Sequence, residues 1–296
     1  MIVASLDFGS NTTLLLVAEV EDGKIKKVIC DETRVTKMGQ GVHQSRRFHP
    51  EALKRIEAAL SDYKKIIDKY RPEKVLAVAT SAARDVENSE SLFSMARRQG
   101  IEIRVISGNE EARLTYLGAF SDKPEREGAC VIDVGGGSTE LIFKEKDRVV
   151  GESVNVGSVR LMDLFGESDP LPLEEFNKMR SYVRERLNPA WSDQGFTSAL
   201  GVAGTPTILA AMEMGLESFD AARIDGFVLK KDVLKNWMER LQKMPLSERE
   251  KVPGLPPQRA DVIVAGCAIL FEFLDKIGLN EMEVSVRGVR FGLALQ

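Results

Sequence analysis

The chain has 296 residues, of which 43% are hydrophobic, and its formal net charge is −4. This composition provides enough apolar surface for two packed domains, or one large one, and excludes a disordered chain. The acidic balance gives no sign of nucleic-acid binding, which is typical of basic surfaces. The only cysteines, Cys30, Cys130 and Cys267, lack C-x-x-C spacing, which excludes a disulfide framework or a thiolate zinc site and fits a reducing compartment.

The sequence contains no stretch that is long and apolar enough for a membrane span. Its most apolar segment, residues 262–274, is interrupted by Glu272. The N-terminus lacks the basic region that opens a signal peptide. We therefore expect a cytoplasmic protein without a membrane partner.

The first half of the chain alternates strands with helices. Residues 2–6, 14–20 and 25–29 are predicted strands, and Asp22-Gly23 is a predicted hairpin turn. The pattern then predicts a helix from Pro50 with a single apolar stripe, a strand over 75–79, a helix to about 99, a strand over 101–106 and a helix over 110–120. This alternation indicates an α/β domain with a mixed or parallel sheet.

A polar connector over residues 121–125 predicts the boundary between domains 1–122 and 123–296, and it is left open that the last helix packs back on the first domain. After it the pattern of the N-terminus returns. Strands are predicted over 131–134, 140–143, 148–154, 198–202 and 282–286, and helices over 172–187, 205–214, 230–241 and 259–276. In the stretch G-V-A-G-T-P-T (201–207), Thr205 is the predicted N-cap of a helix, with Pro206 at its first position.

Two short segments repeat each other in the two halves. D-F-G-S-N-T-T-L-L (7–15) matches D-V-G-G-G-S-T-E-L (133–141) in its Asp, Gly, Thr and final Leu positions. The motif D-x-G is also a common turn, so coincidence is the alternative. Four matches within nine residues, each followed by an apolar strand, favour a pair of like domains whose loops face each other across a cleft.

Loops rich in Gly, Ser and Thr let backbone N–H groups converge on an anion such as phosphate. Neither loop is a P-loop or a Rossmann fingerprint, because the required glycine and lysine spacings are absent. The predicted phosphate-binding residues of the two loops are Gly9, Ser10, Asn11, Thr12, Gly135, Gly136, Gly137, Ser138 and Thr139.

Three acids next to these loops are candidate ligands of Mg²⁺ or Mn²⁺. Asp133 ends a strand, Glu140 follows the loop, and Asp7 is the counterpart of Asp133 in the first half. Mg²⁺ is usually held by one or two carboxylates together with substrate oxygens and water. The structural alternative is that Asp7 and Asp133 only bond their own turns. Their repetition favours a functional role.

The stretch S-G-N-E-E-A-R (107–113) places two acids at the start of a helix. From the residues alone, a structural interpretation is favoured, because acids stabilise the first helical turn and Glu110 can pair with Arg113. Arg84, shortly after a strand, could neutralise charge on a transferred phosphoryl group, or it could lie on a helix surface.

Together these motifs resemble the exopolyphosphatase and guanosine pentaphosphate phosphohydrolase family, over nearly the whole chain. M-G-Q-G-V (38–42) looks like its L-G-x-G segment, and N-V-G-S-V-R-L (155–161) looks like its G-x-x-R-L segment. That family belongs to the acetate kinase, sugar kinase, heat-shock protein and actin superfamily. The resemblance implies two actin-like (ribonuclease H-like) α/β domains around a cleft.

By this resemblance Glu111 would be the catalytic base, Asp133 and Glu140 would organise Mg²⁺, and Arg84 and Ser138 would bind phosphate. The expected activity is exopolyphosphatase, which hydrolyses the terminal phosphoanhydride of inorganic polyphosphate. Hydrolysis of guanosine pentaphosphate is the alternative. A kinase or ATPase of the same superfamily, and a non-catalytic alarmone or nucleotide sensor, are further alternatives, and a homodimer is left open.

Two departures from the family pattern bear on this expectation. The family usually has S-D-x-G-x-R-x-G near the end, whereas this chain has S-V-R-G-V-R-F-G over 285–292, with Val286 in place of the acid. Longer members carry an extra helical domain that extends the polyphosphate channel, which leaves the preferred chain length open.

Overall fold

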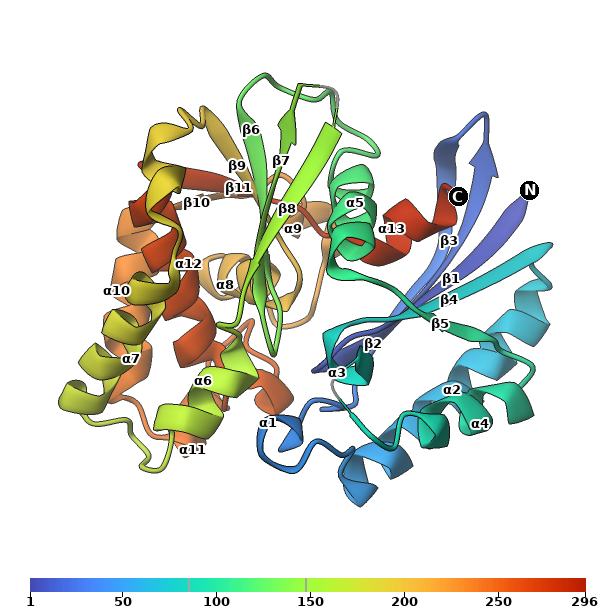
Figure 1. Ribbon diagram of the computed structural model, residues 1–296, viewed down its shortest axis with the longest axis horizontal. Coiled ribbons are helices and arrows are strands. Elements are labelled where there is room, and N and C mark those ends of the chain that lie inside the picture. The colour runs from blue at the N-terminus through green and yellow to red at the C-terminus, as the bar shows by residue number, and fades with distance from the viewer. Residues whose placement is uncertain (85, 147) are drawn as a thin grey trace. The chain divides into compact units, whose positions relative to one another are not determined.

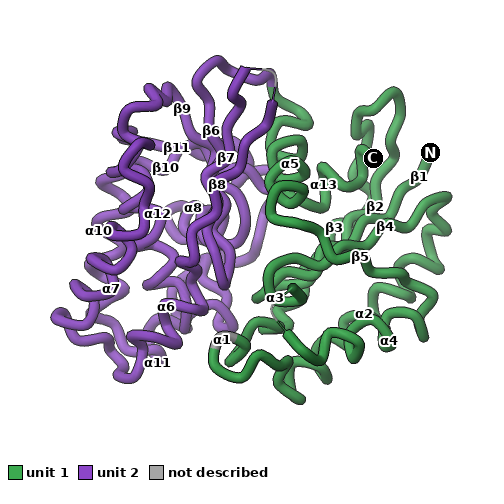
Figure 2. The backbone as a smooth tube through the Cα atoms, in the orientation of Figure 1, with its two compact units in different colours: residues 1–123, 287–296 green, residues 124–286 purple. Residues whose placement is uncertain are grey.

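The computed structural model describes residues 1–84, 86–146 and 148–296, and the chain forms two compact units (Figure 2). Unit 1 contains residues 1–123 and 287–296, and unit 2 contains residues 124–286. The boundary in the chain lies one residue from the expected one. The last ten residues, however, belong to the first unit, although they follow the whole of the second in sequence.

Unit 1 is built on a five-stranded sheet with the order β3-β2-β1-β4-β5 (Figure 1). β1 pairs antiparallel with β2 and parallel with β4, so the sheet is mixed as expected. Asp22 (φ 51°) and Gly23 (φ 68°) form the predicted hairpin turn between β2 and β3. The strands are β1 Ile2–Phe8, β2 Thr12–Glu21, β3 Lys24–Val35, β4 Lys74–Ala79 and β5 Ile103–Val105.

Helices cover both faces of this sheet. Alternate residues of β2 face opposite sides: Leu15 and Val17 pack in the core under α2, whereas Leu16 and Ala18 pack against Phe291 of α13. The predicted apolar stripe of the helix from Pro50 is confirmed and lies buried in the first of these cores. The helices of unit 1 are α1 Val42–Ser45, α2 Pro50–Tyr70, α3 Ser81–Arg84, α4 Glu90–Arg98, α5 Gly108–Ala119 and α13 Val289–Ala294.

The single helix expected up to about residue 99 is wrong, since α3 and α4 are separate helices. Between them, Glu87 N donates to Arg46 O at 2.9 Å, and Asn88 Oδ1 accepts from Phe48 N at 2.8 Å. These tertiary hydrogen bonds replace the intrahelical ones. Asp85 lies outside the described residues.

Unit 2 contains a six-stranded sheet with the order β10-β11-β9-β6-β7-β8. The strands are β6 Ala129–Val134, β7 Thr139–Glu145, β8 Arg148–Val154, β9 Ser198–Val202, β10 Val228–Lys230 and β11 Glu281–Val284. The apolar helix α12 lies in the core of the unit, with most of its side chains buried. The helices are α6 Ser158–Phe165, α7 Leu173–Arg186, η1 Pro189–Asp193, α8 Gly204–Glu213, α9 Ala221–Ile224, α10 Lys231–Lys243, α11 Leu246–Arg249, η2 Pro257–Arg259 and α12 Ile263–Ile277.

The two sheets have the same topology, which confirms the structural repeat predicted from the sequence. The order β8-β7-β6-β9-β11 in unit 2 repeats β3-β2-β1-β4-β5 in unit 1, and β10 is an additional edge strand. The register also matches: Asp7 lies opposite Leu14 across β1 and β2, and Asp133 lies opposite Glu140 across β6 and β7. The predicted α/β class is therefore confirmed.

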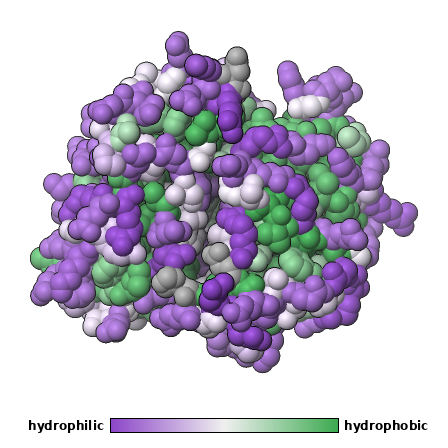
Figure 3. All heavy atoms as spheres, viewed as in Figure 1, coloured by the Kyte–Doolittle hydropathy of each residue, from purple (hydrophilic) through white to green (hydrophobic). Residues whose placement is uncertain are grey.

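Most of the face in Figure 3 is hydrophilic, with apolar atoms showing between the polar side chains. Within the described part of the chain, no helix combines the length and the apolar character needed to cross a membrane.

Candidate active site

Each unit carries one of the repeated loops at the end of its first strand, and both loops close in the same way. Gly9 N donates to Thr12 O at 3.0 Å, and Gly135 N donates to Ser138 O at 3.0 Å. A Cβ atom at Gly9 would lie 3.1 Å from Thr12 O, and one at Gly135 would lie 2.9 Å from Ser138 O. A side chain at the repeated glycine would therefore crowd the carbonyl group that closes this tight connection between antiparallel strands.

The carbonyl groups of the loop in unit 1 are held by the segment after β3. Gly39 N donates to Ser10 O at 2.6 Å, and the amides of Thr36 and Lys37 donate to Asn11 O at 3.0 and 2.9 Å. A Cβ atom at Gly39 would lie 3.0 Å from the Cβ of Ser10. The M-G-Q-G segment therefore supports the loop from behind, a role that its sequence did not indicate.

In unit 2 the start of α6 supports the loop in the same manner. Gly136 O accepts from the amide of Arg160 at 3.0 Å, and Gly137 O accepts from the Nε atom of Arg160 at 2.7 Å. A Cβ atom at Gly157 would lie 2.4 Å from Gly136 O. Because a trans peptide directs its N–H opposite to its C=O, these contacts turn the loop amides away from α6. This orientation suits anion binding.

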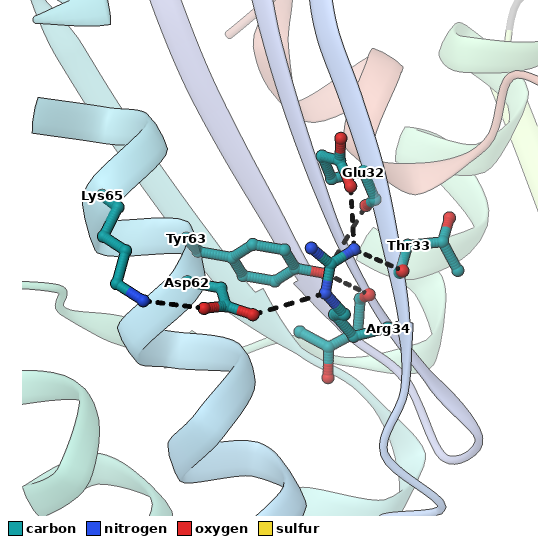
Figure 4. A network of polar contacts seen from close by, with 7 residues as sticks. Glu32, Thr33, Arg34, Asp62, Tyr63 and Lys65 are labelled. Atoms are coloured by element: carbon teal, nitrogen blue, oxygen red, sulfur yellow. Dashed lines mark hydrogen bonds and ion pairs between the residues drawn. The ribbon is translucent and has the colours of Figure 1, made fainter. Parts of the chain in front are cut away.

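The base of the loop in unit 1 is anchored to α2 (Figure 4). The hydroxyl of Tyr63 donates to Thr13 O at 2.6 Å. Beside the ring, Arg34 Nε lies 3.7 Å from Asp62 Oδ2, and Asp62 Oδ1 accepts from Lys65 Nζ at 3.1 Å (Figure 4). Burial raises the pKa of Tyr63 further above its ordinary value, so this hydroxyl remains a donor.

Asp7 lies buried at the end of β1. Its Oδ1 atom has no hydrogen-bond partner among the described residues, so this oxygen does not bond its own turn. Burial raises the pKa of Asp7 to about 7, and the positive charge of Arg290 opposes this increase. A buried carboxylate oxygen that lacks a donor is suited to a cation.

Asp133 and Glu140 form the acidic pair of unit 2. They are direct cross-strand partners on β6 and β7, so their side chains project from the same face of the sheet. Glu140 is buried, and its Oε1 atom accepts from Ser138 Oγ and Ser153 Oγ, each at 2.7 Å. Leu14 occupies the position of Glu140 in unit 1, so the acidic pair belongs to unit 2 alone.

These residues fit a hard divalent cation. Carboxylate oxygens are the ligands that Mg²⁺ and Mn²⁺ prefer. The described residues contain no group of three His, Cys, Asp or Glu side chains arranged for a metal. Two carboxylates are nevertheless sufficient for Mg²⁺, which completes its coordination with substrate oxygens and water.

Arg84 and Glu111 lie together in unit 1. Arg84 Nη1 donates to Glu111 Oε2 at 3.0 Å and to Ile106 O at 2.7 Å. Ser107 caps α5, with its Oγ atom accepting from Glu110 N at 3.3 Å, and so places Glu111 in the first turn. The carboxylate of Glu111 is thus fixed by both a helix terminus and a guanidinium group.

A hydroxyl pair connects this ion pair to the loop of unit 1. Ser10 Oγ lies 3.0 Å from Ser81 Oγ, and Ser81 begins the short helix α3 that ends at Arg84. β1 and β4 are parallel, so the loop and α3 follow strand ends at the same edge of the sheet. Unit 1 therefore brings Asp7, the loop, Arg84 and Glu111 to one edge.

Some predicted residues have other partners. Glu110 pairs with Arg104 at 2.7 Å, whereas Arg113 donates to Gln296 Oε1 at 2.7 Å, so the expected Glu110–Arg113 pair is wrong. The side chain of Thr139 is buried and donates to Val156 O at 2.6 Å, which commits its only proton to the fold.

Two further details concern the later motifs. α8 begins at Gly204, with Ala203 at the N-cap, so the expected Thr205 cap is wrong by two positions. At the position where the family pattern has an acid, Val286 N donates to Asp225 Oδ1 at 3.0 Å. A carboxylate thus lies beside this part of the chain, although it is supplied by another segment.

Sequence reasoning did not identify Ser81 or Ser153 as members of the site. Ser81 lies three residues before Arg84 and belongs to no motif of its own, and Ser153 lies in a strand without a motif. Pairing Glu140 with its cross-strand neighbour on β8, once the strands were predicted, is the signal that could have found Ser153.

Comparisons with known proteins agree with this geometry. Residues 16–296 match the model of the Ppx/GppA phosphatase family. "Exopolyphosphatase 2" of Mycobacterium tuberculosis is 36% identical over 310 residues, covering 99% of this chain and 97% of that protein.

Solved structures give the same result. The Aquifex aeolicus PPX-GPPA enzyme has a TM-score of 0.82 at 34% identity, covering 100% of this chain and 99% of the other. An exopolyphosphatase from Cytophaga hutchinsonii has a TM-score of 0.88 at 25% identity, with coverage of 99% and 96%. The repeated sheet topology is that of two actin-like domains. The chain belongs to the Ppx/GppA phosphatase family.

Proposed function

We propose that this protein is an exopolyphosphatase, which releases orthophosphate from the end of an inorganic polyphosphate chain. The observation that carries the proposal is the ion pair between Arg84 and Glu111. It lies at the same edge of the unit 1 sheet as the first loop, to which the Ser10–Ser81 contact connects it. It places a carboxylate that can orient water beside a cation that can bind the transferred phosphoryl group. The names of the M. tuberculosis and C. hutchinsonii relatives support polyphosphate as the substrate.

In the proposed reaction, water attacks the terminal phosphorus in line with the bond to the bridging oxygen. The new P–O bond forms as the bridging P–O bond breaks, and the shortened polyphosphate leaves with the bond's electron pair. Glu111 orients the water and accepts its proton. Because the transition state of phosphoryl transfer is loose, positioning and charge stabilisation contribute more than strong basicity.

The two loops bind the non-bridging oxygens through backbone amides. In this proposal the loops of residues 9–12 and 135–138 each bind phosphate groups of the substrate, and Arg84 neutralises charge on the terminal group. Mg²⁺ or Mn²⁺ at Asp133 and Glu140 of unit 2 would neutralise phosphate charge when bound. Asp7 of unit 1 is a separate candidate ligand.

The test is phosphate release, with Mg²⁺, from long-chain polyphosphate, tripolyphosphate, guanosine pentaphosphate and ATP, comparing wild type with Glu111→Gln. We expect release from polyphosphate that is lost in the variant while polyphosphate binding persists. Release from guanosine pentaphosphate alone would reassign the substrate and keep the mechanism. Binding without release from any substrate would overturn the hydrolase and favour a sensor, and release from ATP alone would favour an ATPase.

A further inference from the structure

The helix that carries Glu111 is held in unit 1 by the C-terminal end of the chain. α5 packs against α13, and α13 packs in turn on strands β1 and β2 (Figure 1). Leu114 of α5 shares a buried apolar cluster with Val289 and Leu293 of α13. α13 therefore lies between α5 and the sheet.

The two helices approach each other through glycines, so that their backbones touch. A Cβ atom at Gly292 would lie 1.9 Å from Leu114 O, and one at Gly118 would lie 2.1 Å from Gly288 O. No side chain can occupy either position unless the helices move apart. The distance between α13 and α5 is thus set by backbone contact, which leaves little freedom.

Polar contacts fix the C-terminal segment, residues 287–296, to the sheet. Arg290 donates to both carboxylate oxygens of Asp31 on β3, from Nε at 2.7 Å and from Nη2 at 2.8 Å. Ser5 Oγ of β1 donates to Arg290 O at 2.7 Å, and Lys74 Nζ of β4 donates to Gln296 O at 2.8 Å. The segment is therefore attached to three strands.

The same segment also bonds α5 and the residues that follow it. The side chain of Gln296 accepts from Arg113 at 2.7 Å. Beyond the other end of α5, Arg287 pairs with Asp122 at 3.0 Å and donates to Ser121 Oγ at 3.2 Å. Together with the glycine contacts, these bonds hold α5 from its first turns to its end.

Leu114, whose carbonyl touches Gly292, lies one helical turn after Glu111. A displacement of α5 would therefore move the carboxylate of Glu111 with it, because a helix moves as a rigid body over one turn. Arg84 would not follow, since its guanidinium is also bonded to Ile106 O before α5 begins. The contact with α13 thus determines the position of the Glu111 carboxylate relative to the Arg84 guanidinium.

We propose that residues 287–296 are a positioning element for the phosphatase reaction, which acts on Glu111 through the backbone contact between α13 and α5. Gly292 and Gly118 are positioning residues, not catalytic ones. The inference rests on the proposed function of Glu111. The structural alternative is that the segment only stabilises unit 1.

The test uses Gly292→Ala in the full-length protein, with Gly288→Ala as the matched control. A Cβ atom at Gly288 would have nothing within 4 Å, so that variant adds the same methyl group without a clash. Ile56→Val, in the core under α2, is a second control for loss of stability alone. Steady-state kinetics with polyphosphate, thermal unfolding and hydrogen exchange of residues 108–119 are measured for all variants.

We expect Gly292→Ala to lower kcat by about 100-fold, the cost of misplacing a catalytic group by roughly 1 Å. KM should change less than about 3-fold, because the two loops and Arg84 still bind the phosphates. The amides of α5 should exchange faster while those of α2 do not. Both controls should keep the wild-type kcat at temperatures well below their unfolding transitions.

An unchanged kcat in a folded Gly292→Ala protein would overturn the proposal, as would an equal loss of kcat in Ile56→Val at matched stability. If Gly292→Ala does not fold, Leu293→Ala loosens the same contact by a cavity and carries the same expectations. If wild type releases no phosphate, the proposed function fails. Hydrogen exchange then decides separately, because unaltered exchange of α5 overturns the positioning role.

Discussion

Arg84 Nη1 donates to Glu111 Oε2 at 3.0 Å, although the two residues are 27 positions apart. The same nitrogen donates to Ile106 O at 2.7 Å, so the guanidinium is held at two points. In this geometry Arg84 both orients the carboxylate and presents its remaining N–H groups for an anion.

Arg84→Lys should therefore lower kcat although it keeps the positive charge. A planar guanidinium group can donate to the Glu111 carboxylate and to a phosphoryl group at the same time, whereas an ammonium group cannot. We expect kcat to fall by about 10²-fold or more. The unfolding free energy should change by less than about 1 kcal/mol, because the pair is partly exposed. Phosphate release and thermal unfolding are the two measurements.

Arg104→Lys is the matched control. Arg104 pairs with Glu110, the neighbour of Glu111, but its side chain is largely exposed. Its kcat should equal that of wild type. An equal loss of activity in both variants would show that general electrostatics, not the Arg84 geometry, supports the reaction.

Tyr63→Phe tests the anchor below the first loop. The variant removes only the hydroxyl that donates to Thr13 O at 2.6 Å, and it should lower the unfolding free energy by about 1 to 3 kcal/mol. Denaturant unfolding measures this change. Tyr70→Phe, at the end of the same helix, should alter stability by less than about 0.5 kcal/mol. Equal stabilities for the two variants would mean that the anchor contributes nothing.

The parts of the site that could be predicted are those encoded by neighbouring residues. The tight Asp–Gly hairpins follow from turn chemistry within a few positions, and their repetition indicates two like sheets. Asp133 and Glu140 are predicted together because one ends a strand and the other follows the loop, and the hairpin then places them opposite each other. Local spacing is sufficient for such pairs.

The remaining parts depend on contacts between distant segments, which a local pattern does not encode. The sequence does not predict α13 as a helix, because it has only six residues and Gly292 in its interior weakens the helical pattern. That glycine serves the contact with α5. The division between α3 and α4 arises from bonds to residues 46–48. Ser153 is identified as a neighbour of Glu140 only from the pairing of β8 with β7.

Ser153→Ala tests the proposed metal site. In the wild type, Ser153 Oγ donates to Glu140 Oε1 at 2.7 Å. The variant removes this hydrogen bond and keeps the one that Ser138 Oγ donates to the same oxygen. Loss of one such supporting contact typically weakens metal binding by about 10- to 100-fold. The Mg²⁺ concentration at half-maximal activity should rise by this factor, with kcat at saturating Mg²⁺ largely restored.

Ser192→Ala is the control for this experiment. Ser192 is exposed, and within the described part of the chain its hydroxyl bonds Pro189 O and Asp193 Oδ1 of its own 3₁₀ turn. Its Mg²⁺ dependence should match that of wild type. An unchanged Mg²⁺ dependence in Ser153→Ala would remove the support for Glu140 as a ligand.

Asp7→Asn should increase the stability of the metal-free protein at pH 8. Burial raises the pKa of Asp7 from 3.8 to about 7, so the folded protein binds a proton more tightly there than the unfolded chain does. Below about pH 4 the carboxyl is protonated in both states, and burial of its charge costs nothing. Stability then falls as the pH rises from about 4 to 7, and the full cost remains above pH 7.

The raised pKa of Asp7 lowers the unfolding free energy of the wild type by at most about 4 kcal/mol at pH 8. The increase in unfolding free energy in Asp7→Asn will be smaller, because a buried amide also needs hydrogen-bond partners. The increase in stability should disappear near pH 4, and unfolding in EDTA at pH 4 and pH 8 measures it.

Mg²⁺ adds a second comparison. If Asp7 contributes to cation binding, Mg²⁺ will stabilise wild type at pH 8 more than Asp7→Asn, because the cation offsets the buried charge. Equal stabilisation of both proteins would leave Asp133 and Glu140 as the proposed ligands and exclude Asp7.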